Sequence, residues 1–200
     1  MLDAHQRGED VAGVLLLGQR IVVKPAHLDA LSFGIKSFDN ASSRLEEIRE
    51  HILRLFQVDS QVLVEKRERG QEICMGFESR SSSLTSFAPA GVSAPGSMHD
   101  FESKTLGTGL FIPAQLSADV TDELTRVAAA LVREFEIEGL FYINSFVGAD
   151  GTVTTFDVGT TVGLSERSYF PQAAKRDGVT LDELIWRTLD QSTLQEARNA

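Results

Sequence analysis

Two lysines and a short acidic segment are the side chains in this sequence best suited to bind a nucleotide. Lys24 lies at the end of a β-branched run, and Lys104 closes the sequence Asp-Phe-Glu-Ser-Lys at residues 100–104. A lysine ammonium group is a common ligand of phosphate oxygens. A solvated surface charge is nevertheless the more frequent role of a lysine, so neither position is decisive by itself.

An apolar run that ends abruptly in charged residues lies between the two lysines. Residues 62–64 are apolar, Glu65 and Lys66 follow at once, and Glu72 lies beyond Gly70. A strand of this kind can lay a planar base against its apolar edge while its backbone hydrogen-bonds the base. An ionised carboxylate such as Glu72 only accepts hydrogen bonds, which suits ribose hydroxyls. From the residues alone, a nucleotide-binding strand and an ordinary strand end with surface charges are equally good explanations of this segment.

Short β-branched and apolar runs predict the strands that must position these side chains. Residues 20–25 end at a proline, which predicts a buried strand with Lys24 at its end. Residues 61–66 and 72–80 predict two more strands with a turn at Gly70. Residues 140–147 and 152–158 flank Gly-Ala-Asp-Gly at 148–151, which predicts a hairpin.

Helical segments separate the predicted strands. Ser43 and Glu46 have the spacing of a capping box, and apolar residues follow at positions 45, 48, 52, 55 and 56. Apolar spacing predicts a second helix from Ser117, and Thr180 with Glu183 forms a capping box for a last helix. Residues 81–108 are rich in Ser, Gly and Pro and predict a long irregular connection. The expected class is α+β.

The charge and the apolar content of the chain exclude several classes of protein. Its 200 residues carry a formal charge of −10 with a pI near 4.9, whereas a nucleic-acid surface needs clustered Lys and Arg. The apolar run at residues 11–17 is far shorter than the roughly 20 residues that span a bilayer, and Glu9 and Asp10 precede it. We therefore predict no membrane partner, no secretory leader and a cytoplasmic location. The single cysteine, Cys74, is predicted to be a buried structural thiol.

The order of these segments resembles the D-alanine–D-alanine ligase branch of the ATP-grasp superfamily over residues 18–190. The matching stretches are residues 22–26, 62–66 with Gly70 and Glu72, 100–104, 112–114, Gly139 with its hairpin, and 163–171. The resemblance implies an ATP-grasp fold, with antiparallel sheets, flanking helices and a nucleotide cleft between two subdomains. It assigns residues 18–64 to the small ATP-grasp subdomain and 65–190 to the large catalytic one. Residues 1–17 are then an unassigned N-terminal segment, and 191–200 a C-terminal tail.

The resemblance also implies which residues contact ATP. The phosphate contacts are Lys24 and Lys104, the adenine contacts are Glu65, Lys66 and Glu68, and the ribose contact is Glu72. The family's Ser- and Gly-rich phosphate loop corresponds to residues 27–34, which are one residue longer here but keep Ser32 and Gly34. Backbone N–H groups of such a loop are preorganised donors to phosphate oxygens.

The predicted hairpin departs from the family at its metal site. Family enzymes carry an Arg and, two residues later, an Asp in the first strand, with Glu-x-Asn in the second; the Asp, Glu and Asn bind magnesium. These positions are Tyr142, Asn144, Asp157 and Gly159 here. Since Mg²⁺ prefers hard oxygen ligands, the resemblance implies a weakened magnesium site at Asp157 and Asn144.

The expected oxyanion and substrate positions are altered as well. In the family the arginine and a glycine N–H, here Gly163, stabilise a tetrahedral intermediate, whereas Tyr142 offers an uncharged hydroxyl. Loss of one such donor typically costs about 10²–10³ in rate. Ser165 and Ser168 fall where the family binds the carboxylate of the second substrate, and N-capping of a helix ahead of Pro171 is an equally good explanation of them.

Two functions are compatible with these residues. In the first, ATP phosphorylates a small-molecule carboxylate, and an amine attacks the acyl phosphate to give an amide, ADP and phosphate. The second is a degenerate ATP-grasp binding module without ligase activity, which Tyr142, Asn144 and Gly159 favour. No segment before Gly18 resembles the family's N-terminal substrate domain, so we expect a fragment of a longer protein, or a partner or homodimer that completes the site.

Overall fold

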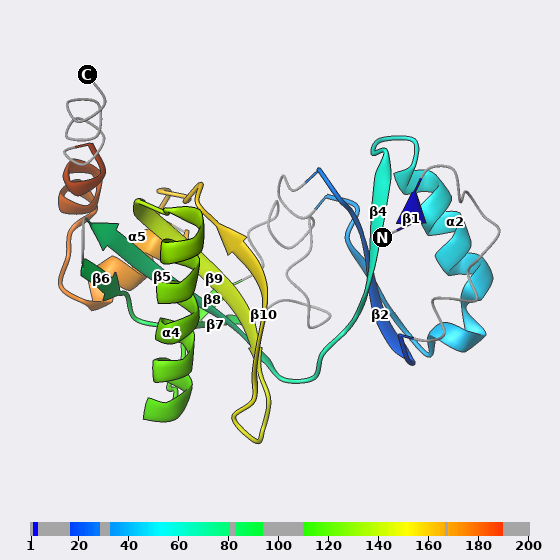
Figure 1. Cartoon of the computed structure of the whole chain (residues 1–200), viewed down its shortest axis with the longest axis horizontal. Coiled ribbons are helices and arrows are strands. Elements are labelled where there is room, and N and C mark those ends of the chain that lie inside the picture. Colours follow the sequence, from blue (N-terminus) through cyan, green and yellow to red (C-terminus); the bar gives the residue numbers. More distant parts are fainter. Residues whose placement is uncertain are drawn as a thin grey trace. The chain divides into compact units, whose positions relative to one another are not determined.

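The chain divides into two compact units in the computed structural model, which describes residues 2–3, 17–28, 33–80, 83–93, 110–166 and 168–189. One unit comprises Met1–Glu68 with Ser93–Leu110, and the other comprises Arg69–Val92 with Phe111–Ala200. Each unit packs α-helix against a β-sheet (Figure 1). This arrangement confirms the predicted α+β class.

The described part of the first unit is a four-stranded sheet covered by helix α2 (Leu45–Leu55). Its strands, in spatial order, are β1 (Leu2–Asp3), β4 (Gln61–Lys66), β2 (Arg20–Pro25) and β3 (Lys36–Asp39), all antiparallel. The amphipathic helix α2 packs its apolar side on this sheet. The core between them consists of Ile21, Val23, Phe38, Ala41, Ile48, Ile52, Leu55 and Val62. The strands predicted at residues 20–25 and 61–66 are confirmed.

The start of α2 differs from the sequence prediction. Ser43 lies in a 3₁₀ turn, η3 (Ala41–Ser43), and its hydroxyl donates to the carbonyl of Asn40 at 2.9 Å. Asn40 adopts φ of 54°, which closes this turn, and the helix begins only after Arg44. Arg44 pairs with Glu47 at 2.7 Å, and no side chain caps the helix. The helix itself was predicted correctly, but the Ser43–Glu46 capping box is wrong.

The second unit has a six-stranded sheet with helices on both faces. Its strands follow the order β10 (Val153–Gly159), β9 (Gly139–Val147), β5 (Gln71–Arg80), β7 (Ala90–Ser93) and β8 (Leu110–Pro113), and β6 (Ser83–Ser86) pairs with β5. Helix α4 (Ala118–Phe135) packs on one face, against Ile73, Met75 and Phe77. Helix α5 (Tyr169–Arg176) and the helix at residues 181–189 pack on the other face, in a cluster that includes buried Cys74.

Two sequence predictions are refined by this sheet. The segment 81–108 is not wholly irregular, because β6 and β7 lie within it and pair with β5. The hairpin of β9 and β10 is confirmed, with its turn closed by a hydrogen bond from Gly148 N to Thr152 O at 2.9 Å. The register of the hairpin shifts between Thr155 and Asp157, which marks a β-bulge at Phe156.

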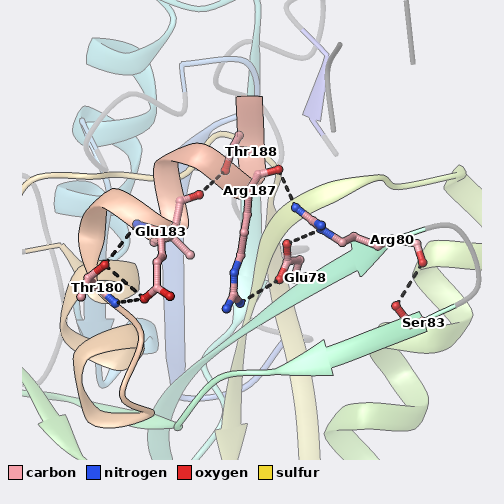
Figure 2. Close-up of polar contacts among 8 residues, drawn as sticks. Glu78, Arg80, Ser83, Thr180, Glu183, Arg187 and Thr188 are labelled. Carbon is pink, nitrogen blue, oxygen red and sulfur yellow. Dashed lines mark hydrogen bonds and ion pairs between the residues drawn. The ribbon is translucent and has the colours of Figure 1, made fainter. Parts of the chain in front are cut away.

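The helix at residues 181–189 is capped at its first turn and hydrogen-bonded to β5 near its last turn (Figure 2). Thr180 and Glu183 form the predicted capping box: Thr180 N donates to Glu183 Oε2 at 2.9 Å, and Glu183 N donates to Thr180 Oγ1 at 3.2 Å. Buried Glu78 of β5 accepts from Arg80 Nε at 2.7 Å, and Arg80 Nη2 donates to the carbonyl of Arg187 at 2.6 Å. These contacts attach the helix to β5. Within the described residues, no helix has the length and apolar content needed to cross a bilayer.

Candidate functional site

Lys24 and Glu65 form an ion pair on the outward side of the first unit's sheet. Lys24 pairs in register with Leu63 of β4, so Glu65, two residues further on, lies diagonally across on the same face. Its Nζ lies 2.8 Å from Glu65 Oε2, with the two side chains 21% and 44% exposed. Alternate residues of β2 point into the core, which turns Lys24 outward. The structure thus brings together two of the predicted ATP contacts.

The other predicted base and ribose contacts follow Glu65 along the chain. Lys66, the last residue of β4, lies 3.0 Å from Glu68 in a second ion pair, in which the lysine is more exposed than Lys24. Glu72 is half-buried in β5, where it pairs in register with Phe146 of β9. It belongs to the second unit, whereas Glu65, Lys66 and Glu68 belong to the first. Ser32 and Lys104 lie outside the described residues, so all these ATP contacts stay predictions.

Asn144 and Asp157 face each other across the β9–β10 hairpin. They are paired in register immediately after the bulge, and Asn144 Nδ2 donates to Asp157 Oδ2 at 2.9 Å. The bulge therefore brings an amide and a carboxylate to the same point on the sheet. Among the described residues no group of three or more His, Cys, Asp or Glu side chains is placed to hold a metal ion. The hydrogen-bonded pair itself offers a metal ion one carboxylate and one amide.

The Tyr142 side chain fills the space next to Gly159 on the same two strands. The two residues are paired in register, and a Cβ built on Gly159 would overlap the tyrosine ring and its hydroxyl. Position 159 therefore has no room for a side chain while the Tyr142 ring keeps this position. These residues fit one magnesium ion held through Asp157 together with nucleotide phosphates and water, but not a site with a third side-chain ligand at 159.

The loop before α5 brings three predicted residues into contact. Ser165 Oγ and Ser168 Oγ lie 2.8 Å apart, and Ser168 N donates to Ser165 O at 2.8 Å. A Cβ on Gly163 would lie 2.6 Å from Ser168 Oγ, so a side chain at position 163 would displace this hydroxyl. Ser168 occupies the N-cap position of α5, but its hydroxyl makes no capping hydrogen bond. The N-capping explanation therefore does not account for its side chain.

Tyr169 anchors α5 beneath this loop and was not singled out from the sequence. Its hydroxyl accepts from Gly76 N at 2.7 Å and donates to Ala88 O at 2.9 Å. Burial raises the pKa of the Tyr169 phenol far above its ordinary value, so it remains a donor. A Cβ on Gly76 would lie 2.6 Å from the Tyr169 ring, which shows how closely α5 approaches β5. The apolar spacing around Tyr169 was the available sequence signal.

The profile of the family described as D-ala D-ala ligase C-terminus matches residues 7–190. The chain belongs to this family. The D-alanine–D-alanine ligase of Streptomyces coelicolor is 31% identical over 176 residues, which are 85% of this chain and 43% of that ligase. The chain thus spans less than half the length of that curated relative.

Solved ligase structures share the fold of this D-alanine–D-alanine ligase C-terminal chain. The Bacillus anthracis D-alanine–D-alanine ligase complexed with ATP has a TM-score of 0.76 at 19% identity, covering 100% of this chain and 60% of that one. The ligase of Coxiella burnetii has a TM-score of 0.75 at 18% identity, covering 99% of this chain and 53% of that one. The predicted ATP-grasp fold is therefore confirmed.

Proposed function

We propose that this chain is the nucleotide-binding and catalytic part of an ATP-dependent carboxylate–amine ligase similar to the D-alanine–D-alanine ligases. The observation that carries the proposal is the family match over residues 7–190, which includes every candidate contact named above. The outward ion pair of Lys24 and Glu65 supports it, because it holds a partly exposed ammonium near a strand end, on the face of the sheet away from the core.

In the proposed reaction a carboxylate oxygen attacks the γ-phosphorus of ATP, and the bond to the β–γ bridging oxygen breaks. The products of this step are an acyl phosphate and ADP. An amine then attacks the acyl carbon, and the tetrahedral intermediate collapses to an amide with loss of phosphate and a proton. Both substrates are small molecules, consistent with the names of the relatives.

The chain's own residues bind and orient the reactants in this proposal. Lys24 and Lys104 hold the phosphates, Glu65, Lys66 and Glu68 line the adenine pocket, and Glu72 binds the ribose. The contacts assigned to the developing oxyanion are Gly163 N–H and the Tyr142 hydroxyl, and those assigned to the second carboxylate are Ser165 and Ser168. A magnesium ion bound near Asp157 and Asn144 would neutralise charge on the phosphates.

Magnesium-dependent release of ADP, measured with the full-length protein across a panel of D- and L-amino acids, tests this function. We expect ADP release that depends on an amino acid and a new amide detected by mass spectrometry. Lys24→Ala should lower that rate strongly. Arg49→Ala, which removes one charge from an exposed ion pair on α2, should leave the rate unchanged. Nucleotide binding without ADP release from any amino acid would instead support the binding module.

A further inference from the structure

Strand β10 contains one residue more than β9 between two side-chain hydrogen bonds, and this extra residue is Phe156. Thr155 is paired in register with Ser145. The next pair is Asp157 with Asn144, so the residue between Thr155 and Asp157 has no partner on β9. The hydroxyls of the first pair lie 2.9 Å apart, and in the second Asn144 Nδ2 donates to Asp157 Oδ2 at 2.9 Å. Phe156 is therefore the inserted residue of a β-bulge, with a side-chain contact across the hairpin on either side of it.

The bulge decides which face of the sheet carries Asp157. Side chains of β9 alternate between two faces, so Ile143 packs on the side of α4 and Asn144 points to the opposite side. If the pairing continued regularly, Phe156 would lie opposite Asn144. Asp157 would then lie opposite Ile143, on the side of the sheet that α4 covers. Because an unpaired carboxylate is costly to bury among apolar side chains, the bulged register is the favourable one.

The ring of Phe146 packs against the inserted residue. Phe146 lies two residues after Asn144 and therefore on the same face of β9. Its ring stacks on that of Phe156, with the centroids 4.6 Å apart and an interplanar angle of 25°. Aromatic pairs at this separation stabilise proteins beyond the effect of burial alone. Since Phe156 is 37% exposed, burial in the core accounts for only part of its position, and the stack supplies a specific contact.

We propose that Phe146 and Phe156 are positioning residues, whose stacked rings hold the bulge and thereby keep Asp157 beside Asn144 for a magnesium ion. The inference rests on the proposed function and deepens its metal site. Neither ring carries an oxygen ligand, so both act through Asp157. The hydrogen-bonded pair offers a single carboxylate, so metal affinity depends strongly on where that carboxylate lies. Loss of the stack lets the bulge move and lowers the time that Asp157 spends at the metal position.

Hydrogen exchange of the full-length protein without nucleotide or metal tests the stack itself. Phe156→Ala and Phe146→Ala should each accelerate exchange of the amides of residues 155–158. The amide of Gly148, which closes the hairpin turn, should exchange as before. Phe156→Tyr, which keeps a stacking ring, should retain protection. Unchanged exchange in both alanine variants, or acceleration that extends equally to Gly148, would overturn the proposal.

Magnesium titrations of the full-length protein at saturating ATP test the link to the metal. Phe156→Ala should weaken magnesium binding by about two- to tenfold, the effect of one lost aromatic pair, whereas Phe156→Tyr should stay within about twofold of the natural protein. Phe135→Ala, which removes a ring that is 68% exposed on α4, is the control and should change nothing.

The same titrations in an Asp157→Asn background separate positioning from a general effect on the fold. Phe156→Ala should weaken magnesium no further there, because the ring acts through the carboxylate that is already lost. An equal effect of Phe156→Ala in both backgrounds, or none in either, would overturn the proposal. If Asp157→Asn itself leaves magnesium binding unchanged, the metal site of the proposed function fails, and the positioning role fails with it even if hydrogen exchange confirms the stack.

Discussion

The ring of Tyr142 occupies the space that any side chain at position 159 would need, and Gly159 is its cross-strand partner. Both residues depart from the family pattern, in which an arginine and an asparagine are expected. The two positions are sterically linked, because the Tyr142 ring on β9 lies where a side chain at position 159 of β10 would start. A side chain at position 159 therefore requires the Tyr142 ring to move or to be replaced.

Gly159→Ala alone should destabilise the protein by about 1–3 kcal/mol, the usual cost of overpacking. Tyr142→Ala should relieve most of this cost, because the added methyl group then has room. Thermal unfolding of the two single variants and the double variant measures the coupling between them. Additive effects of the two substitutions would show that the ring and Gly159 do not share this space.

Asn144→Asp should raise magnesium affinity in the presence of ATP, since it adds a second carboxylate next to Asp157. Without metal the same variant should be less stable, because two like charges replace a hydrogen bond of 2.9 Å. Asp157→Asn should abolish whatever metal dependence the protein has. Magnesium titrations with ATP, and unfolding in EDTA, measure both effects. An unchanged magnesium affinity in both variants would place the metal elsewhere.

The attachment of the helix at residues 181–189 should depend more on Arg80 than on Arg187. Arg80→Ala removes a 2.7 Å hydrogen bond from buried Glu78 and another from the carbonyl of Arg187, and should cost about 2 kcal/mol. Arg187→Ala removes only a longer contact of 3.7 Å from a partly exposed side chain and should cost less than about 1 kcal/mol. Chemical denaturation ranks the two variants, and the reverse order would contradict the contacts of Figure 2.

The contribution of Asp59 to stability should depend on pH in a defined direction. The hydrogen bond with the His27 side chain, with those from the backbone, lowers its pKa on folding from an ordinary value of 3.8. Its stabilising effect is therefore present above that pH and is lost as the pH falls below it. The stability difference between the natural protein and Asp59→Asn should therefore be constant from about pH 7 to 5 and narrow below pH 3.8. Denaturation midpoints measured over this range provide the check. A difference that narrows already near neutral pH would require another titrating group.

Local sequence patterns predicted the elements that are specified by neighbouring residues, and missed those that depend on contacts with distant parts of the chain. The strand at residues 20–25 and the Thr180–Glu183 capping box follow from neighbouring residues, and the structure confirms both. The Ser43–Glu46 capping box failed because the left-handed backbone at Asn40 closes a 3₁₀ turn first. The strands β6 and β7 were missed because pairing with β5, rather than their own composition, makes them extended.

The candidate site was only partly predictable for the same reason. The resemblance identified Tyr142 and Gly159 as departures, but only the cross-strand register reveals that they share one space. The stack of Phe146 on Phe156 likewise depends on the bulge, and nothing in the sequence indicated where the register of the hairpin shifts.

Calorimetric titration of the full-length protein with ATP, ADP and adenosine in the presence of magnesium tests the central claim most directly. The account predicts that ATP and ADP bind with dissociation constants below the millimolar range. It also predicts that Lys24→Ala and Lys104→Ala each weaken ATP more than adenosine, while Arg49→Ala changes neither. No binding of either nucleotide at millimolar concentration would contradict the account, and equal weakening of ATP and adenosine would show that the lysines do not contact phosphate.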